Sequence, residues 1–423
     1  MMILHTSDWH LGRTLCGRRR HDEFASFLDW LAETLALRRV EVLLISGDIF
    51  DTGSPGSRAQ ELYYNFLRRA SEIPACAHVV IIAGNHDSPS FLSAPGALLK
   101  TMNIHVVGSL EDPHEVMLLK RGDGRPGLIV CAVPFPRERE VREAREGESA
   151  EDKEKKMAEG IRRHYEQAAG LARRMRAEAP ARPGGGETPP HLPIVAMGHL
   201  FAAGGRTVEG DGVRDLSVGS LAHVPADIFS PVFDYVALGH LHLPQTVGSD
   251  RRIRYSGAPL AMGFGEAGGG KSVCLLELTP SGLETELVDV PVFQRLESVK
   301  GDWEAIGARL QRLKDEGAKA WLEIEYTGPQ IIGDLRGRLD EAVAGAGLEI
   351  LRVRNKTMAD RALSSAEGAP ESLDEMDYMD VFARCLEAHE VPEEDRPELL
   401  GAYREIVSDL LEGDGQADGS SQV

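Results

Sequence analysis

Five short motifs contain aspartate, asparagine and histidine, whose oxygen and nitrogen atoms bind divalent metal ions. Each motif comes directly after an apolar run that is typical of a buried strand. A ligand set without sulfur suits Mn²⁺, Fe²⁺ or Zn²⁺. The Asp48 carboxylate could bridge two such ions about 3.5–4 Å apart, an arrangement that hydrolyses phosphate esters. The motifs are Asp8-Trp9-His10, Gly47-Asp48, Gly84-Asn85-His86-Asp87, Gly198-His199 and Gly239-His240-Leu241-His242.

An α/β core must position these motifs, because predicted strands and helices alternate along the first third of the chain. Residues 2–5, 40–46 and 79–83 are apolar runs, while residues 21–39 and 57–71 have the pattern of helices. Ligand sites in such sheets lie beyond the carboxyl ends of the strands. Few helices separate the later strands, which favours a mixed sheet or two packed sheets. These later strands are predicted at residues 128–133, 193–197, 235–238, 253–256 and 272–278.

The ordered motifs resemble those of the calcineurin-like metallophosphoesterases, and within them the SbcD family of bacterial nuclease subunits. Four stretches carry the likeness: residues 5–12 (HTSDWHLG), 47–54 (GDIFDTGS), 84–88 (GNHDS) and 237–242 (ALGHLH). The resemblance covers about residues 1–280, is weaker over 281–357 and is only architectural beyond. It implies a four-layer α/β/β/α sandwich with a dimetal site at one edge.

The resemblance also implies a role for each matching residue. His86 would protonate the leaving oxygen or stabilise the transition state. The cofactors would be two divalent metal ions, expected to be Mn²⁺, although the ligands would also accept Fe²⁺ or Zn²⁺. Asp51 stands where archaeal and eukaryotic relatives have a second histidine, so its role stays open. The metal ligands would be Asp8, His10, Asp48 and His242 for one ion, and Asp48, Asn85, His199 and His240 for the other.

The chain is expected to contain more than one domain, since 423 residues exceed the usual size of a single domain. A small α+β domain is predicted after the core, followed by two acidic helices with apolar stripes that need a partner. The resemblance implies that the α+β domain caps the DNA path and that the helices bind an SbcC-type ATPase. The predicted boundaries are 1–280 for the nuclease domain, with a charged excursion at 138–190, then 281–357, 358–412 and a disordered tail at 413–423.

The charge distribution leaves room for a nucleic-acid surface despite a formal net charge of −20. Residues 360–423 contain 18 acidic and 4 basic residues, so most of the negative charge lies in this terminal segment. The remainder could therefore present a basic surface to DNA phosphates. A solvated helix start explains part of the basic cluster equally well. The candidate DNA contacts are Arg13, Arg18, Arg19 and Arg20.

The function implied by the resemblance is that of a metal-dependent DNA nuclease, hydrolysing phosphodiesters with a metal-activated water. With its ATPase it would act as an ATP-dependent double-strand exonuclease and a single-strand and hairpin endonuclease. Double-stranded DNA ends and hairpins would be its substrates in repair, replication and recombination, within a heterotetramer containing a homodimer of this chain. Two alternatives stay open: a small-molecule or cyclic-nucleotide phosphodiesterase on the same fold, and a non-catalytic binding subunit.

Two further features bear on location and nucleotide binding. The chain has no apolar run near the ~20 residues of a membrane helix and no recognisable secretory signal. We therefore expect a cytoplasmic protein, associated with the nucleoid when bound to DNA. Residues 265–272 (GEAGGGKS) fit the phosphate-binding pattern GxxxxGK[ST], but β-like residues follow where a helix is required. A flexible hairpin or surface loop is the better interpretation, and ATP would be bound by the partner.

Overall fold

The computed structural model describes most of the chain, in two compact units spanning Met1–Glu297 and Ser298–Val423. The described residues are 1–142, 148–179, 192–205, 224–279, 282–330, 332–355 and a few single positions between 382 and 403. The predicted partner-binding helices and tail lie almost entirely outside these residues. No helix within the described ranges is both long and apolar enough to cross a bilayer.

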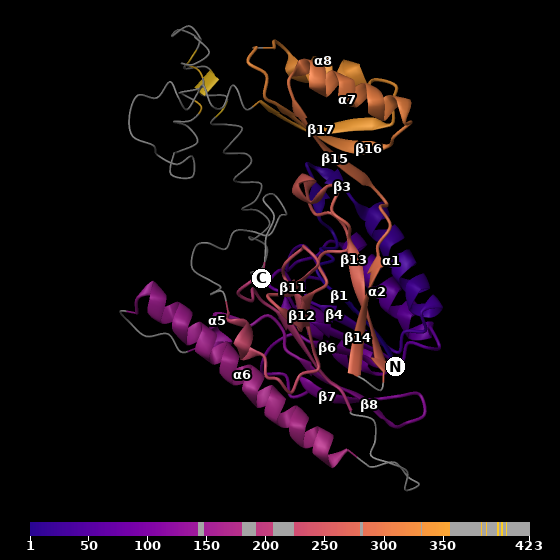
Figure 1. The fold of residues 1–423 in the computed structure, drawn as a ribbon, viewed down its shortest axis with the longest axis vertical. Coiled ribbons are helices and arrows are strands. Elements are labelled where there is room, and N and C mark those ends of the chain that lie inside the picture. The colour runs from indigo at the N-terminus through magenta and orange to yellow at the C-terminus, as the bar shows by residue number, and fades with distance from the viewer. Residues whose placement is uncertain are drawn as a thin grey trace, which may run out of the picture. The chain divides into compact units, whose positions relative to one another are not determined.

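The first unit is built on two six-stranded sheets (Figure 1). The first sheet has the order β14-β13-β1-β4-β5-β6, in which β1, β4, β5 and β6 are parallel and the other two strands are antiparallel additions at one edge. The strands are β1 (Met2–Thr6), β4 (Val42–Ser46), β5 (His78–Ile82), β6 (Ile104–Val107), β13 (Ser272–Thr279) and β14 (Gly282–Asp289).

The second sheet has the order β11-β12-β10-β9-β8-β7, with four parallel central strands and an antiparallel strand at each edge. The parallel arrangement brings the carboxyl ends of neighbouring strands to one edge of each sheet. The strands are β7 (Val116–Lys120), β8 (Pro126–Ala132), β9 (Ile194–His199), β10 (Tyr235–Gly239), β11 (Gln245–Val247) and β12 (Asp250–Tyr255).

Alternation along each strand explains why the two sheets pack face to face. On β4, Val42 and Leu44 belong to the core between the sheets, whereas Leu43 and Ile45 pack toward the helices on the outer face. All four side chains are fully buried, which accounts for an apolar run with no polar alternation. In the second sheet, successive side chains of β8 likewise alternate between the core between the sheets and the core beneath the helices.

Helices cover the two outer faces and complete the predicted four-layer α/β/β/α sandwich. Helices α1 (His21–Leu37) and α2 (Ser57–Glu72) pack on the first sheet. Helix α6 (Ala150–Glu178) packs on the second through Ile161 and Tyr165. This helix lies in the predicted charged excursion, yet its apolar side supplies a layer of the core.

The shorter helices are α3 (Pro89–Ser93), α4 (Gly96–Lys100), α5 (Glu138–Val141) and the 3₁₀ turns η1 (Ala226–Ile228) and η2 (Phe264–Glu266). A two-stranded ribbon, β2 (Thr14–Leu15) with β3 (Arg18–Arg19), precedes α1.

The second unit is a small α+β fold with its own core. It has one three-stranded sheet of β15 (Arg295–Gly301), β16 (Ala320–Tyr326) and β17 (Leu348–Asn355). Helices α7 (Trp303–Asp315) and α8 (Leu335–Val343) pack on it. The amino-terminal caps Asp302 and Asp334 fix where each helix begins, because each side chain accepts a hydrogen bond from the first turn.

Candidate metal centre

Every predicted metal ligand lies at the carboxyl end of a strand, and the two sheets contribute ligands from opposite sides. The first sheet supplies Asp8 and His10 after β1, Asp48 after β4 and Asn85 after β5. The second sheet supplies its ligands from two adjacent strands, at the end of β9 and after β10. These are His199, His240 and His242. The face-to-face packing of the sheets therefore brings together residues far apart in sequence.

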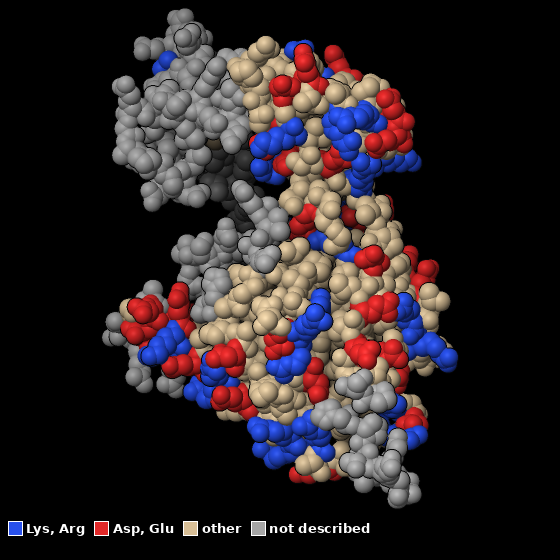
Figure 2. Space-filling view, viewed as in Figure 1, with Lys and Arg blue, Asp and Glu red and all other residues tan. Residues whose placement is uncertain are grey.

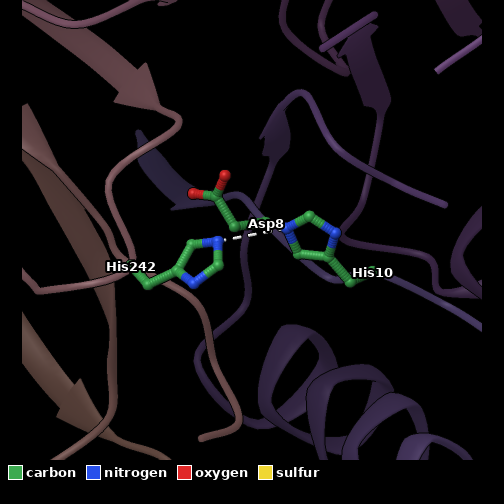
Figure 3. Close-up of side chains that lie close together, drawn as sticks. All are labelled: Asp8, His10 and His242. Carbon is green, nitrogen blue, oxygen red and sulfur yellow. Dashed lines mark hydrogen bonds between the residues drawn. The ribbon is translucent and has the colours of Figure 1, made fainter. Parts of the chain in front are cut away.

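One group of potential ligands consists of Asp8, His10 and His242, all buried (Figure 3). One ligand atom from each lies within 4.8 Å of the others. The two imidazole rings meet edge-on, with their Nε2 atoms 3.1 Å apart, beside the aspartate (Figure 3). Nitrogen and carboxylate atoms that converge in this way can bind a transition-metal ion.

A second group lies next to the first and shares the Asp8 carboxylate with it. It contains Asp8, Asp48 and His199, with ligand atoms again within 4.8 Å. Asn85 completes it, because its Oδ1 lies 3.0 Å from both His199 Nε2 and His240 Nδ1. Asp48 Oδ2 lies between the groups, 3.3 Å from the nearest nitrogen of His199 and 3.6 Å from that of His10. Its position suits a carboxylate that bridges two ions.

The charges in the second group are strongly coupled. Burial by itself would lower the pKa of His199, but the Asp48 carboxylate and its hydrogen bond raise that pKa to about 9. The same pair keeps the pKa of Asp48 well below its usual value in spite of burial. Burial and the charge of His199 lower the pKa of His240 to about 3. The centre thus concentrates negative charge on Asp48 and keeps His240 neutral, as a ligand requires.

Backbone contacts orient the His199 ring and the Asp8 carboxylate at the centre. His199 Nδ1 lies 2.9 Å from the carbonyl of Ser46, and a carbonyl can only accept a hydrogen bond. A hydrogen is therefore on Nδ1, and Nε2, which faces Asp48 and Asn85, is the nitrogen that could bind a metal ion after giving up its own hydrogen. The amide of His240 donates to Asp8 Oδ1 at 2.9 Å, which fixes the carboxylate at the same time. Such contacts orient metal ligands before the ion binds.

The loops that carry the ligands are strained and tightly packed. Asp8, His10, Asp48 and His240 all have positive φ angles, which residues other than glycine rarely adopt. Gly84 packs so closely that a Cβ there would lie 2.1 Å from Asp48 Oδ1. The glycine of this motif is therefore required by close approach of the backbone to a ligand.

His86 lies beside the two groups and is partly exposed. Its amide donates to Asp48 Oδ1 at 2.9 Å, and its Nδ1 lies 2.8 Å from the carbonyl of Asp51. Since that carbonyl only accepts, Nε2 is the atom left to exchange a proton with a substrate. The His10 ring lies edge-on to the His86 ring, with the two ring centres 4.9 Å apart. His10, Asp51 and His86 form a third group of converging ligand atoms, and Asp51 also contacts Arg13 at 3.2 Å.

The arginines predicted to contact DNA have different environments. Arg18 and Arg19 are exposed on β3, the ribbon that follows the first motif. Arg13 is partly buried against Asp51. Arg20 is almost fully buried and forms an ion pair with Glu23, so its guanidinium is not presented to a ligand at the surface. Figure 2 shows basic and acidic side chains interspersed on the face in view, without one large basic patch.

Sequence reasoning missed three residues that support the centre. Asp87 accepts hydrogen bonds from the amides of Ile49, Phe50 and Gly84, which ties the loops after β4 and β5 together. Ser7 donates to the Asp8 carboxylate. Glu266 contacts His242 from the segment that resembles a phosphate loop. Asp87 stood within a recognised motif, whereas no local signal pointed to Glu266.

The donor set fits divalent metal ions. Carboxylate, amide and imidazole atoms converge from five strand ends, in two overlapping groups, with the histidine nitrogens oriented toward the same space. Such a set suits Mn²⁺, Fe²⁺ or Zn²⁺ without selecting among them.

Comparison with known proteins agrees with this geometry. Residues 1–244 match the family model of the calcineurin-like phosphoesterases, and residues 292–390 match that of the type 5 capsule protein repressor C-terminal domain. The chain is 35% identical over 414 residues to the SbcD subunit of the SbcCD nuclease of Escherichia coli strain K12, covering 97% of this chain and 98% of that protein.

SbcD proteins of two other bacteria are also similar. The one from Bacillus subtilis strain 168 is 34% identical over 336 residues, covering 77% of this chain and 78% of that protein. The one from Rhodobacter capsulatus is 37% identical over 286 residues, covering 66% of each. The similarity to the Escherichia coli protein, which covers 97% of this chain, extends over both units.

Proposed function

The chain belongs to the calcineurin-like phosphoesterases, in the SbcD family of nuclease subunits, and from this premise we propose how its residues carry out metal-dependent cleavage of DNA. Membership makes it a hydrolase of phosphodiester bonds. The observation that supports the proposal most strongly is the pair of overlapping ligand groups, with Asp48 between them.

We propose that two divalent ions bind, with Mn²⁺ the expected ion. The ligands of the first ion would be Asp8, His10, Asp48 and His242, and those of the second Asp48, Asn85, His199 and His240. When bound, such ions activate water for attack and neutralise charge on the phosphodiester. The protein's part is to hold the ligands in place on loops with strained backbone angles.

His86 is the proposed acid. Its Nδ1 is held by the carbonyl of Asp51, so Nε2 can carry a proton toward the leaving oxygen of the substrate. Its amide contact with Asp48 Oδ1 keeps this ring next to the centre. General acid catalysis of this kind contributes about 10²–10⁴-fold to the rate.

DNA ends and hairpins are the proposed substrates, with an SbcC-type ATPase as the proposed partner. The exposed Arg18 and Arg19 on β3 are the proposed phosphate contacts. The ATPase would supply the nucleotide site and bind residues 358–412, and two copies of this chain would join it in a heterotetramer. We expect the complex to work in the cytoplasm, at the nucleoid.

The test is cleavage of an end-labelled DNA hairpin by the purified chain with Mn²⁺, with and without the cognate ATPase and ATP. His86→Ala should lower the cleavage rate about 10²–10⁴-fold while metal binding is unchanged. His114→Ala is the matched control, since His114 is exposed and lies outside the ligand groups. It should cleave like the unmodified chain.

The alternative substrate is a small or cyclic phosphodiester, so the same preparations are tested on bis-p-nitrophenyl phosphate and cyclic nucleotides. If these compounds are cleaved in a metal-dependent reaction and DNA is not cleaved, with or without the ATPase, the substrate is a small diester and not DNA. Absence of metal binding would favour a non-catalytic role.

A further inference from the structure

The segment that resembles a phosphate-binding loop has a different place in this protein. A 3₁₀ turn, η2 (Phe264–Glu266), is followed by strand β13, where a phosphate loop would open a helix. The sequence-based interpretation as a flexible surface loop is nevertheless wrong for Glu266. Its side chain is only 5% exposed, and its contacts lead directly to the metal centre.

Glu266 has contacts with a histidine ligand, a backbone amide and a lysine. Its Oε1 lies 3.2 Å from His242 Nδ1. Its Oε2 accepts a hydrogen bond from the amide of Met262 at 3.2 Å and forms an ion pair with Lys271. Lys271 Nζ also donates to the carbonyl of His242 at 3.2 Å. The three side chains therefore form a closed set in which the carboxylate holds the ring of His242 and the lysine holds its backbone.

The chemistry of these contacts decides the orientation of His242. Glu266 pairs with the ammonium group of Lys271 and accepts a hydrogen bond from the amide of Met262, so its side chain is a carboxylate that only accepts. The hydrogen of His242 is therefore on Nδ1. Its Nε2 then faces His10 Nε2, 3.1 Å away, inside the first ligand group.

We propose that Glu266 and Lys271 are positioning residues that hold His242 ready to bind the first metal ion and so set the affinity of that site. This inference rests on the proposed function, because it assumes that His242 is a ligand. Carboxylates behind ligating histidines fix the tautomer and increase the basicity of the ring, and their loss costs about 10–100-fold in metal affinity. Lys271 stabilises the buried charge of Glu266 through their ion pair.

The experiment measures Mn²⁺ binding by calorimetry with the full chain freed of metal. We expect two binding events for the unmodified protein. Glu266→Ala should weaken the first site about 10–100-fold and leave the second unchanged. Glu266→Gln should lose less, because its amide oxygen can still accept from His242 Nδ1. Lys271→Met should also weaken the first site, since Glu266 is then left without its cation.

A second glutamate–histidine pair, in which the glutamate is buried and the histidine is partly exposed, provides the matched control. Glu115 is buried to a similar degree, and its Oε1 lies 2.7 Å from His164 Nε2, but neither residue belongs to a ligand group. Glu115→Gln should lower thermal stability without changing either binding event. A loss of Mn²⁺ affinity in Glu115→Gln as large as in Glu266→Gln would assign the effect to general destabilisation and overturn the inference.

A double variant shows whether Glu266 acts through His242. Adding Glu266→Ala to His242→Ala should change the Mn²⁺ affinity no further. A further loss of affinity would show that Glu266 does not act through His242 and would overturn the inference.

If Glu266→Ala does not fold, the variants Glu266→Gln and Lys271→Met are sufficient for the test. Unchanged affinity in both would refute the inference while leaving the proposed function intact. A chain that binds no Mn²⁺ at all would refute the proposed function instead.

Discussion

His10 Nε2 and His242 Nε2 lie 3.1 Å apart, although 232 residues separate them along the chain. His10 follows a strand of the first sheet and His242 a strand of the second. Two imidazole nitrogens at this distance can share one hydrogen or one cation, since two bare lone pairs would repel each other. The packing of the two sheets has thus brought together a group of potential metal ligands that neither sheet contains by itself.

Loss of the negative charge of Asp48 is expected to reduce metal binding and cleavage more than the loss of any other single proposed ligand, because this carboxylate lies between the two ligand groups. Asp48→Asn should reduce bound Mn²⁺ from two ions to one or none and slow cleavage on the order of 1000-fold. Calorimetry and hairpin cleavage measure the two effects. Asp51→Asn is the matched comparison, three residues away, and should still bind two ions. If Asp51→Asn loses an ion and Asp48→Asn does not, the bridging role belongs to Asp51.

Gly84 is expected to tolerate no side chain. In Gly84→Ala the new Cβ would lie 2.1 Å from Asp48 Oδ1 and 2.3 Å from its backbone nitrogen, so the loop must move. Overpacking of this kind costs about 1–3 kcal/mol of stability, and the displaced carboxylate should also weaken Mn²⁺ binding. Urea unfolding and calorimetry provide the measurements.

The control for this substitution is Gly96→Ala in helix α4, where nothing lies within 4 Å of the new Cβ. Alanine there should be neutral or stabilise by up to about 1 kcal/mol. Equal losses of stability at both glycines would show that the close approach at Gly84 has no special cost.

His5 is expected to make folding sensitive to acid. Its ring is fully buried beside Tyr235, with Nδ1 3.0 Å from the phenol oxygen, and burial lowers its pKa to about 3. In the unfolded chain the same group titrates at a pKa near 6.5. The unfolded state therefore binds the proton first, and the stability present above about pH 6.5 is lost as pH falls toward 3. Between pH 7 and pH 5 the loss is about 2 kcal/mol.

His5→Gln removes this titration while an amide can still contact Tyr235. Urea unfolding with EDTA, at pH 7 and pH 5, should show a fall in stability that is smaller in His5→Gln by about 2 kcal/mol. An identical fall in both proteins would mean that other groups account for the acid sensitivity.

Arg18 and Arg19 are expected to contribute to DNA affinity without affecting the metal centre. The combined change Arg18→Gln and Arg19→Gln should weaken hairpin binding, and the slope of log K against log salt should decrease by about 1 for each phosphate that is no longer neutralised. Fluorescence anisotropy in Ca²⁺ at several salt concentrations measures both. Arg173→Gln on α6, also exposed, is the control. Affinity and salt slope that fall equally in Arg173→Gln would indicate a general charge effect.

The sequence by itself was sufficient to predict the class of fold and the types of residue that converge at the candidate centre. Residues with potential oxygen and nitrogen ligand atoms, such as Asp48 and His199, directly follow or end apolar runs. The carboxyl ends of parallel strands share an edge, so local patterns were sufficient to place these ligands together. The uninterrupted apolar character of β4 likewise required cover on both faces, which the structure confirms with a sheet on one side and helices on the other.

Only the tertiary structure decided how the ligands are supported and which charged residues are available. Helix α6 had the composition of a surface helix, yet long-range packing uses its apolar side as a layer of the core. Arg20 was predicted with its neighbours, but it is buried and paired with Glu23. Glu266 lies 24 residues after His242, in a segment whose local pattern indicated a flexible hairpin or surface loop. Such contacts depend on how separate loops meet after the sheets have packed, and no periodicity or short motif encodes that meeting.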